Sequence, residues 1–72
     1  MVELHFFAAA REAAGAATIA VPPGTLSSAL ARFPSPVIER CSFLINGLAI
    51  TDRDTLLVDG DRVDVLPPFA GG

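Results

Sequence analysis

Hydrophobic and polar residues alternate at both ends of the chain, which predicts two half-buried β-strands. From Val2 to Phe7 apolar residues recur at every second position, and the same period returns from Arg62 to Leu66. Since successive side chains of a strand point to opposite faces of a sheet, each segment should bury one face and expose the other. The core-facing set is expected to be Val2, Leu4, Phe6, Val63 and Val65, and the outward-facing set Glu3, His5, Phe7, Arg62, Asp64 and Leu66.

Two helical segments are expected in the middle of the chain, each with a polar cap and a proline. Leu26, Leu30 and Phe33 fall at helical spacing, which predicts a helix over 26–33 that begins at a Thr25 cap and ends before Pro34. A further short turn is expected over 36–41, with a serine as its cap and a proline at its first helical position.

The remaining segments are strands and turns. Asn46-Gly47 is a strong signal for a tight hairpin turn. Residues 8–15 are ambiguous, because alanine favours helix while Gly15 marks a turn, and we interpret them as a loose connection within a hairpin. The other predicted elements are strands over 17–21, 42–45 and 48–50, a short apolar plug over 56–58 and a turn over 59–61.

The order of these elements suggests a fold class. A strand pair precedes the helix and three strands follow it, so the helix can supply the crossover that lets the first and last strands lie side by side in parallel. This arrangement predicts an α+β protein with the β-grasp, or ubiquitin-like, roll, in which one main helix covers a mixed sheet. We expect residues 1–66 to form the domain and residues 67–72 to form a flexible C-terminal tail.

The composition is that of one small domain stabilised by apolar burial. The chain has 72 residues, 51% of them hydrophobic, and its single cysteine, Cys41, cannot form an internal disulfide. The net charge of −3, the scattered arginines and the lack of lysine argue against nucleic acid as a partner. The sequence shows no metal-ligand cluster, signal peptide or membrane span, so we expect a cytoplasmic protein without a bound metal or a membrane contact.

The last residues follow the final strand directly and are unusual in composition. Pro67 and Pro68 favour an extended backbone, and Ala70-Gly71-Gly72 has almost no side chain, so it could enter a narrow channel. At ~3.3 Å per extended residue, the stretch from Pro68 could carry the terminal carboxylate on the order of 15 Å from the domain. We interpret the tail as a probe for another protein's active site; the alternative is a frayed end or an expression remnant.

Both ends of the chain carry a family resemblance. The stretch Leu4-His5-Phe6-Phe7-Ala8-Ala9-Ala10-Arg11-Glu12-Ala13-Ala14-Gly15 resembles the opening of the molybdopterin synthase small subunit, the MoaD-type sulfur carrier of the MoaD/ThiS family. Later landmarks of that family are similar to Asn46-Gly47, Asp59-Gly60-Asp61 and Pro67-Pro68-Phe69-Ala70-Gly71-Gly72, in the same order. The match spans the whole chain, with specific motifs at the ends and a compressed segment before Asn46.

The resemblance implies a β-grasp sulfur carrier whose chemistry takes place at Gly72, next to Gly71. In such carriers an E1-like adenylyltransferase activates the terminal glycine with ATP, and a sulfurtransferase supplies the sulfur that makes it a thiocarboxylate. The tail then enters the large subunit of molybdopterin synthase, in a heterotetramer, and gives sulfur to cyclic pyranopterin monophosphate to form the molybdopterin dithiolene. The chain alone is expected to bind no cofactor and to use no catalytic side chain, so it would not be an enzyme by itself.

A partner surface is expected beside the root of the tail. Phe7 and Leu66 should lie outside the core on neighbouring strands and form a shared apolar patch, unless residues 9–14 cover Phe7. The resemblance makes Arg11 a further partner contact; its other possible role is a surface ion pair with a neighbouring glutamate. The predicted partner-binding set is Phe7, Arg11, Leu66, Pro67, Pro68, Phe69 and Ala70.

Other functions stay open at this point. The sulfur carrier of thiamine biosynthesis shares the fold and the Gly-Gly ending, and ranks second because such carriers generally lack the Phe-Phe-Ala opening and the double proline. A carrier for cysteine biosynthesis, or a ubiquitin-like binding module or protein modifier, is a further alternative. No motif supports His5 and Cys41 as a catalytic pair, so we expect His5 at the surface and Cys41 as a small buried hydrophobe.

Overall fold

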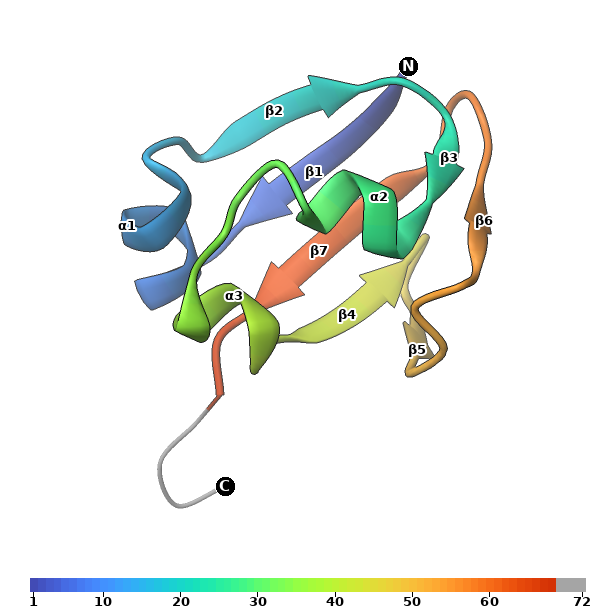
Figure 1. The fold of residues 1–72 in the computed structure, drawn as a ribbon. Helices are drawn as coiled ribbons and strands as arrows, with labels where there is room; N and C mark the ends of the chain where they lie inside the picture. Colours follow the sequence, from blue (N-terminus) through green and yellow to red (C-terminus); the bar gives the residue numbers. More distant parts are fainter. Residues whose placement is uncertain (69–72) are drawn as a thin grey trace.

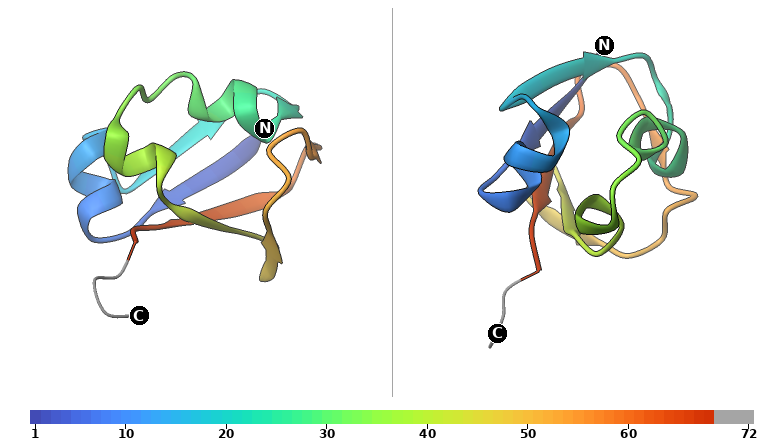
Figure 2. Two further views of the ribbon diagram at one scale, coloured as in Figure 1. Left: turned by 60° about the horizontal axis from the view of Figure 1, so that its bottom comes forward. Right: turned by 60° about the vertical axis from the view of Figure 1, so that its left-hand side comes forward.

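A curved sheet with helices gathered on one of its faces makes up the fold (Figure 1, Figure 2). The structure is a computed structural model, and it describes residues 1–68. Within that range no helix is long and apolar enough to cross a membrane. The elements are β1 (Val2–Phe6), α1 (Ala9–Ala14), β2 (Thr18–Val21), β3 (Gly24–Thr25), α2 (Leu26–Leu30), α3 (Pro36–Glu39), β4 (Ser42–Ile45), β5 (Leu48–Ile50), β6 (Leu56–Leu57) and β7 (Arg62–Leu66).

The first and last strands form the parallel centre of the main sheet, as the element order predicts. The strand order is β2-β1-β7-β4-β5, with β1 and β7 parallel and the other neighbours antiparallel. A separate two-stranded sheet pairs β3 with β6. This mixed sheet, wrapped around helices that cross between its two halves, confirms the β-grasp prediction (Figure 1).

The hydrophobic core lies between the inner face of the sheet and the helices. Every residue that alternation assigned to the core is at most 2% exposed. The rings of Phe6 and Phe33 meet edge to face, with their centroids 5.0 Å apart. The helices contribute Ala10, Leu26, Ala29, Leu30 and Ile38 to this core.

Local capping explains where two of the helices begin. The Thr25 hydroxyl accepts a hydrogen bond from the backbone N–H of Ser28 at 3.1 Å, and the Ser35 hydroxyl accepts one from Val37 at 3.1 Å. Each bond satisfies an N–H group that has no partner inside its helix. Pro36 follows Ser35 at the first helical position, where its missing N–H costs nothing. Both predicted caps are confirmed.

Residues 8–15 contain a helix and not the loose connection that we interpreted. Helix α1 spans Ala9–Ala14, and Ala10 is fully buried. Gly15, at φ 78°, ends the helix in the left-handed conformation and donates its N–H to the carbonyl of Arg11 at 2.9 Å. The turn signal of Gly15 was therefore correct, but it marks a helix C-cap.

Two other elements differ from the sequence prediction. Helix α2 ends at Leu30 and not at Phe33. Pro34 disfavours helical backbone at Phe33, the residue before it. Phe33 lies outside the helix, and its ring packs on Phe6. The stretch over 56–58 is not a simple apolar plug, since β6 pairs with β3 and two of its three side chains are exposed. The exposed fractions are 67% for Leu56 and 53% for Val58.

Candidate functional site

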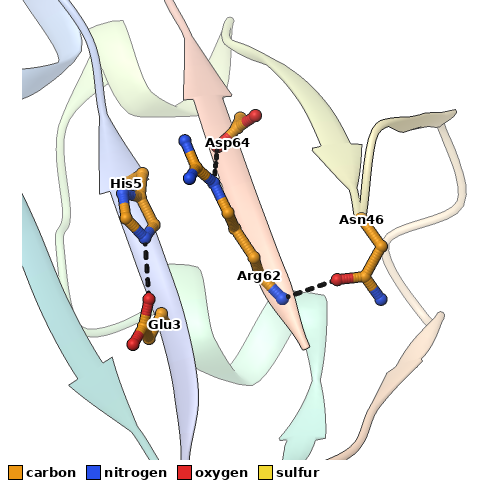
Figure 3. A network of polar contacts seen from close by, with 5 residues as sticks. All are labelled: Glu3, His5, Asn46, Arg62 and Asp64. Atoms are coloured by element: carbon orange, nitrogen blue, oxygen red, sulfur yellow. Dashed lines mark hydrogen bonds and ion pairs between the residues drawn. The ribbon is translucent and has the colours of Figure 1, made fainter. Parts of the chain in front are cut away.

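The sheet face opposite the helices carries three rows of side chains across the two central strands. The parallel register of β1 and β7 defines the first two rows, and continuing it by one position defines the third. The residues of these rows change from polar to apolar toward the end of β7, where the tail begins; Figure 3 shows the polar residues of the first two rows. In that direction the rows are Glu3–Arg62, His5–Asp64 and Phe7–Leu66.

The apolar end of this face is exposed. Phe7 is 38% exposed, and its N–H donates to the carbonyl of Val65 at 3.1 Å, which holds it beside β7. Leu66 is half-buried and lies opposite Ser42 of β4, with the half-buried Leu44 next on the same face. We call Phe7, Leu44 and Leu66 the tail-root patch. Phe7 is therefore covered only in part, and not completely as in the alternative in which residues 9–14 cover it.

Two polar pairs continue the face away from this patch (Figure 3). The ring Nε2 of His5 lies 2.9 Å from Glu3 Oε1, and Arg62 Nε donates to Asp64 Oδ1 at 2.8 Å. The side chains of His5 and Asp64 are only 20% and 19% exposed, whereas Glu3 and Arg62 are 62% and 51% exposed. One partner of each pair is mostly exposed to water, and surface pairs of this kind typically add about 0–1 kcal/mol to stability. We therefore treat them as a polar surface beside the patch and not as a main source of stability.

The start of β7 is fixed by the hairpin turn between β4 and β5. Asn46 and Gly47 have φ values of 50° and 83°, as a tight two-residue turn requires. The Asn46 side chain accepts a hydrogen bond from the Arg62 N–H at 2.9 Å and donates to Asp61 Oδ1 at 2.8 Å (Figure 3). Hydrogen bonds from the Val58 N–H and from Asn46 lower the pKa of the Asp61 carboxyl. Strand β7, and with it the root of the tail, is thereby held in register.

The described part of the tail is two prolines long. Pro67 is buried, whereas Pro68 is exposed. The tail leaves at the end of the sheet, beside α3 (Figure 1). The predictions for Phe69, Ala70, Gly71 and Gly72 concern residues outside the described range and stay predictions.

Arg11 lies on helix α1 and is exposed. Within residues 1–68 no salt bridge involves it, so the predicted surface ion pair does not form there. Its role in partner binding stays a prediction.

Cys41 lies in the core and not at the outward face of the sheet. Cys41 is 7% exposed, and its thiol donates to the carbonyl of Val37 at 3.2 Å. Burial raises the pKa of this thiol, and the nearby charge of Arg53 only partly opposes the change, so the thiol is protonated at neutral pH. No group of three His, Cys, Asp or Glu residues in the described range could hold a metal ion. Cys41 is the buried hydrophobe that the sequence predicted.

The contribution of β4 to this site was not predicted. Ser42 and Leu44 share the outward face of β4, but the apolar run Phe43-Leu44-Ile45 does not alternate, so periodicity did not mark Leu44 as outward-facing. Periodicity also does not give the neighbour of each strand. The pairing of β4 with β7 was therefore needed before Leu44 could be placed in the tail-root patch.

Known structures resemble the chain along its whole length. SAMP1 from Haloferax volcanii has a TM-score of 0.73 at 25% identity, with 99% of this chain and 98% of that chain covered. The small archaeal modifier protein 1 from Methanosarcina acetivorans has a TM-score of 0.72 at 26% identity, with 99% and 95% covered. A chain in the complex of subunits 1 and 2 of molybdopterin-converting factor from Helicobacter pylori 26695 has a TM-score of 0.72 at 25% identity, with 99% and 97% covered.

A comparison with curated proteins finds no match. A family model, in contrast, matches residues 4–72, a span that includes the tail-root patch and the Gly-Gly ending. The sheet topology and the resemblance at both chain ends agree with this match. The chain therefore belongs to the ThiS family and has the β-grasp fold of ubiquitin-like sulfur carriers.

Proposed function

We propose that this protein is a sulfur carrier that acts as the small subunit of a molybdopterin synthase. The proposal rests on one observation. A structural match that covers 99% of this chain is to a chain in the complex of subunits 1 and 2 of molybdopterin-converting factor. The tail-root patch supports it, because an exposed aromatic ring with two leucines lies where a partner that takes up the tail would meet the domain.

The chemistry would be confined to the carboxylate of Gly72. A carboxylate is a poor electrophile because its two oxygens share the negative charge and neither leaves readily. An E1-like adenylyltransferase would join this carboxylate to AMP and release pyrophosphate from ATP. A persulfide on the sulfurtransferase would displace the AMP and form an acyl disulfide, and a thiol would reduce that disulfide to release the thiocarboxylate. Two such carriers would each deliver one sulfur of the molybdopterin dithiolene, and water would supply the oxygen that returns each to a carboxylate.

In this proposal the chain's own residues bind and position, and partners supply the catalytic groups. The tail-root patch docks the domain, and the buried Pro67 sets the direction of the tail. The hydrogen-bonded pairs of His5 with Glu3 and of Arg62 with Asp64 would border the docked surface. The activating enzyme, the sulfurtransferase and the large subunit are the proposed partners.

A reconstitution tests the carrier chemistry. The protein is incubated with an E1-like enzyme, ATP and a sulfurtransferase with its sulfur donor, and its intact mass is measured. We expect a mass gain equal to the exchange of one oxygen for sulfur, located at the C-terminal peptide, and no gain in a variant that lacks residues 71–72. If the mass of the full chain does not change, the protein is not a sulfur carrier for that system.

A second assay tests the pathway. Adding the large subunit and cyclic pyranopterin monophosphate to the charged carrier should yield molybdopterin. If the charged carrier instead gives its sulfur only to a thiazole-forming synthase, the thiamine alternative holds, to which the match to the ThiS family model also points.

A role as a protein modifier is the second candidate, and the similarity to small archaeal modifier protein 1 favours it. Such a role requires an isopeptide bond between Gly72 and a lysine of another protein. The sequence contains no lysine, so copies of this chain could not be joined to one another through side-chain amines. Mass spectrometry of tryptic peptides would show a lysine of the target carrying a C-terminal fragment of this chain.

A further inference from the structure

Strand β2 lies at one edge of the main sheet, and no other described strand pairs with its outer side. The N–H of Phe6 donates to the carbonyl of Ala17 at 2.8 Å, which fixes the phase of the ladder between β1 and β2. In an antiparallel ladder every second residue exchanges hydrogen bonds with the neighbouring strand. The residues between them, Thr18 and Ala20, therefore direct their N–H and C=O groups away from β1. Both residues are exposed.

Within β2 itself this edge lacks the usual protection against pairing, since its prolines, Pro22 and Pro23, occur only after its last residue. Native edge strands commonly carry charged residues or proline, which keep other strands away. Residues 13–31 contain no charged residue, so β2 and both of its flanks are uncharged. The other edge strand, β5, differs in having only three residues and in being followed at once by the charged stretch 52–54. The charged residues that give the net charge of −3 therefore all lie outside residues 13–31, the segment in which two copies would pair.

We propose that β2 pairs antiparallel with β2 of a second copy of this chain, about a two-fold axis at Ile19. In this register Thr18 of each copy lies opposite Ala20 of the other, so the outward backbone groups of both residues form hydrogen bonds. Ile19 is half-buried and packs on the core, and it would meet the Ile19 of the second copy on that side. The edge is therefore complementary to itself in both hydrogen bonds and side chains.

Such a dimer is compatible with a free tail. The tail-root patch lies on β1, β7 and β4, and the outer side of β2 faces away from these strands. Pairing at β2 would join two five-stranded sheets into one continuous sheet and leave both tails accessible. The proposal does not depend on the function of the tail, so its failure would leave the carrier proposal intact.

Amide hydrogen exchange of the full chain tests the pairing residue by residue. Across a concentration series that reaches the millimolar range, the amides of Thr18 and Ala20 should exchange more slowly as the concentration rises. The amide of Ala49, which points outward from β5 by the same ladder argument, serves as the control and should not change. Sedimentation equilibrium on the same samples should show the mass moving from one chain to two.

A matched pair of variants locates the contact. Ala20→Arg and Ala49→Arg each add one positive charge at an exposed alanine of an edge strand. The two-fold axis would place the new arginines of both copies near each other at the shared edge. Ala20→Arg should therefore weaken dimerisation by about tenfold or more. Ala49→Arg should leave the dimerisation constant unchanged.

Three outcomes would overturn the proposal. The first is a monomer throughout the series, with fast exchange of Thr18 and Ala20 at every concentration. The second is an equal loss of dimerisation in both arginine variants, which would place the contact elsewhere. The third is protection of Thr18 and Ala20 only after the large subunit of molybdopterin synthase is added, which would assign this edge to a different protein.

Discussion

Replacing Phe7 by alanine tests whether the tail-root patch is a docking surface or part of the core. Phe7 is 38% exposed, so about three-fifths of its surface is already covered in the free protein. Burying a whole phenylalanine side chain contributes roughly 1.5–3 kcal/mol. The covered part of Phe7 therefore contributes roughly 1–2 kcal/mol to the free energy of unfolding, and Phe7→Ala should lose about that amount in urea denaturation.

The effect of the same substitution on binding should be larger. An aromatic anchor in an interface typically contributes about 2 kcal/mol or more, which corresponds to a dissociation constant raised about 30-fold. Calorimetric titration of the variant into the large subunit measures this change directly. Leu66→Ala, on the neighbouring strand, should behave in the same way.

Phe6 provides the matched control on the same strand. It is 2% exposed and packs against Phe33, so Phe6→Ala should lose roughly 3–5 kcal/mol or leave the chain unfolded. Suppose that Phe7→Ala destabilises the fold as much as Phe6→Ala does and binds the large subunit normally. Phe7 would then act as a core residue, and the partner surface would lie elsewhere.

Four further changes test other parts of the argument. Deleting residues 71–72 should leave the melting temperature unchanged and abolish sulfur transfer. Ser35→Ala should lower the free energy of unfolding by about 1 kcal/mol, because the N–H of Val37 loses its cap. The lowered pKa of Asp61 means that its contribution to stability is complete above the ordinary Asp range and is lost as the pH falls through the lowered pKa. Asp61→Asn should therefore flatten the acid dependence of stability below about pH 4. The raised pKa of the Cys41 thiol predicts slow alkylation near neutral pH and fast alkylation in urea.

The strands and their faces could be predicted because the signal is local. Alternation alone placed Phe7 and Leu66 outside the core and Val63 and Val65 inside it, and the structure confirms all four placements. The turn at Asn46 was equally readable, because few residues tolerate its positive φ. In each case the sequence pattern and the local backbone energy favour the same conformation.

Helix α1 could not be predicted in this way, because its sequence does not decide between helix and loop. Six residues make an unstable helix in isolation, since nucleation costs more than so few hydrogen bonds return. What stabilises α1 is tertiary packing, including the complete burial of Ala10 and the contact between α1 and α3. The alanines of α1 do not show which face packs on α3, because alanine is common on both buried and exposed helix faces.

Part of the candidate site could not be predicted from local sequence patterns either. Leu44 enters the tail-root patch through the pairing of β4 with β7, and that pairing joins segments about twenty residues apart in the chain. The predicted Arg11 contact and the glycines of the tail rested on family resemblance, which no geometry within residues 1–68 replaces.

The central position of β7 explains why the tail and the outward face of the sheet form one site. A strand with neighbours on both sides is held by two hydrogen-bonded ladders, so its last residue cannot shift without breaking one of them. A tail that continued an edge strand would have its root held on one side only. The same central position brings Phe7 to one side of Leu66 and the β4 residues to the other. In the proposed complex, a partner that takes up the tail would therefore contact side chains from the beginning, middle and end of the sequence, and these residues come together only on the folded sheet.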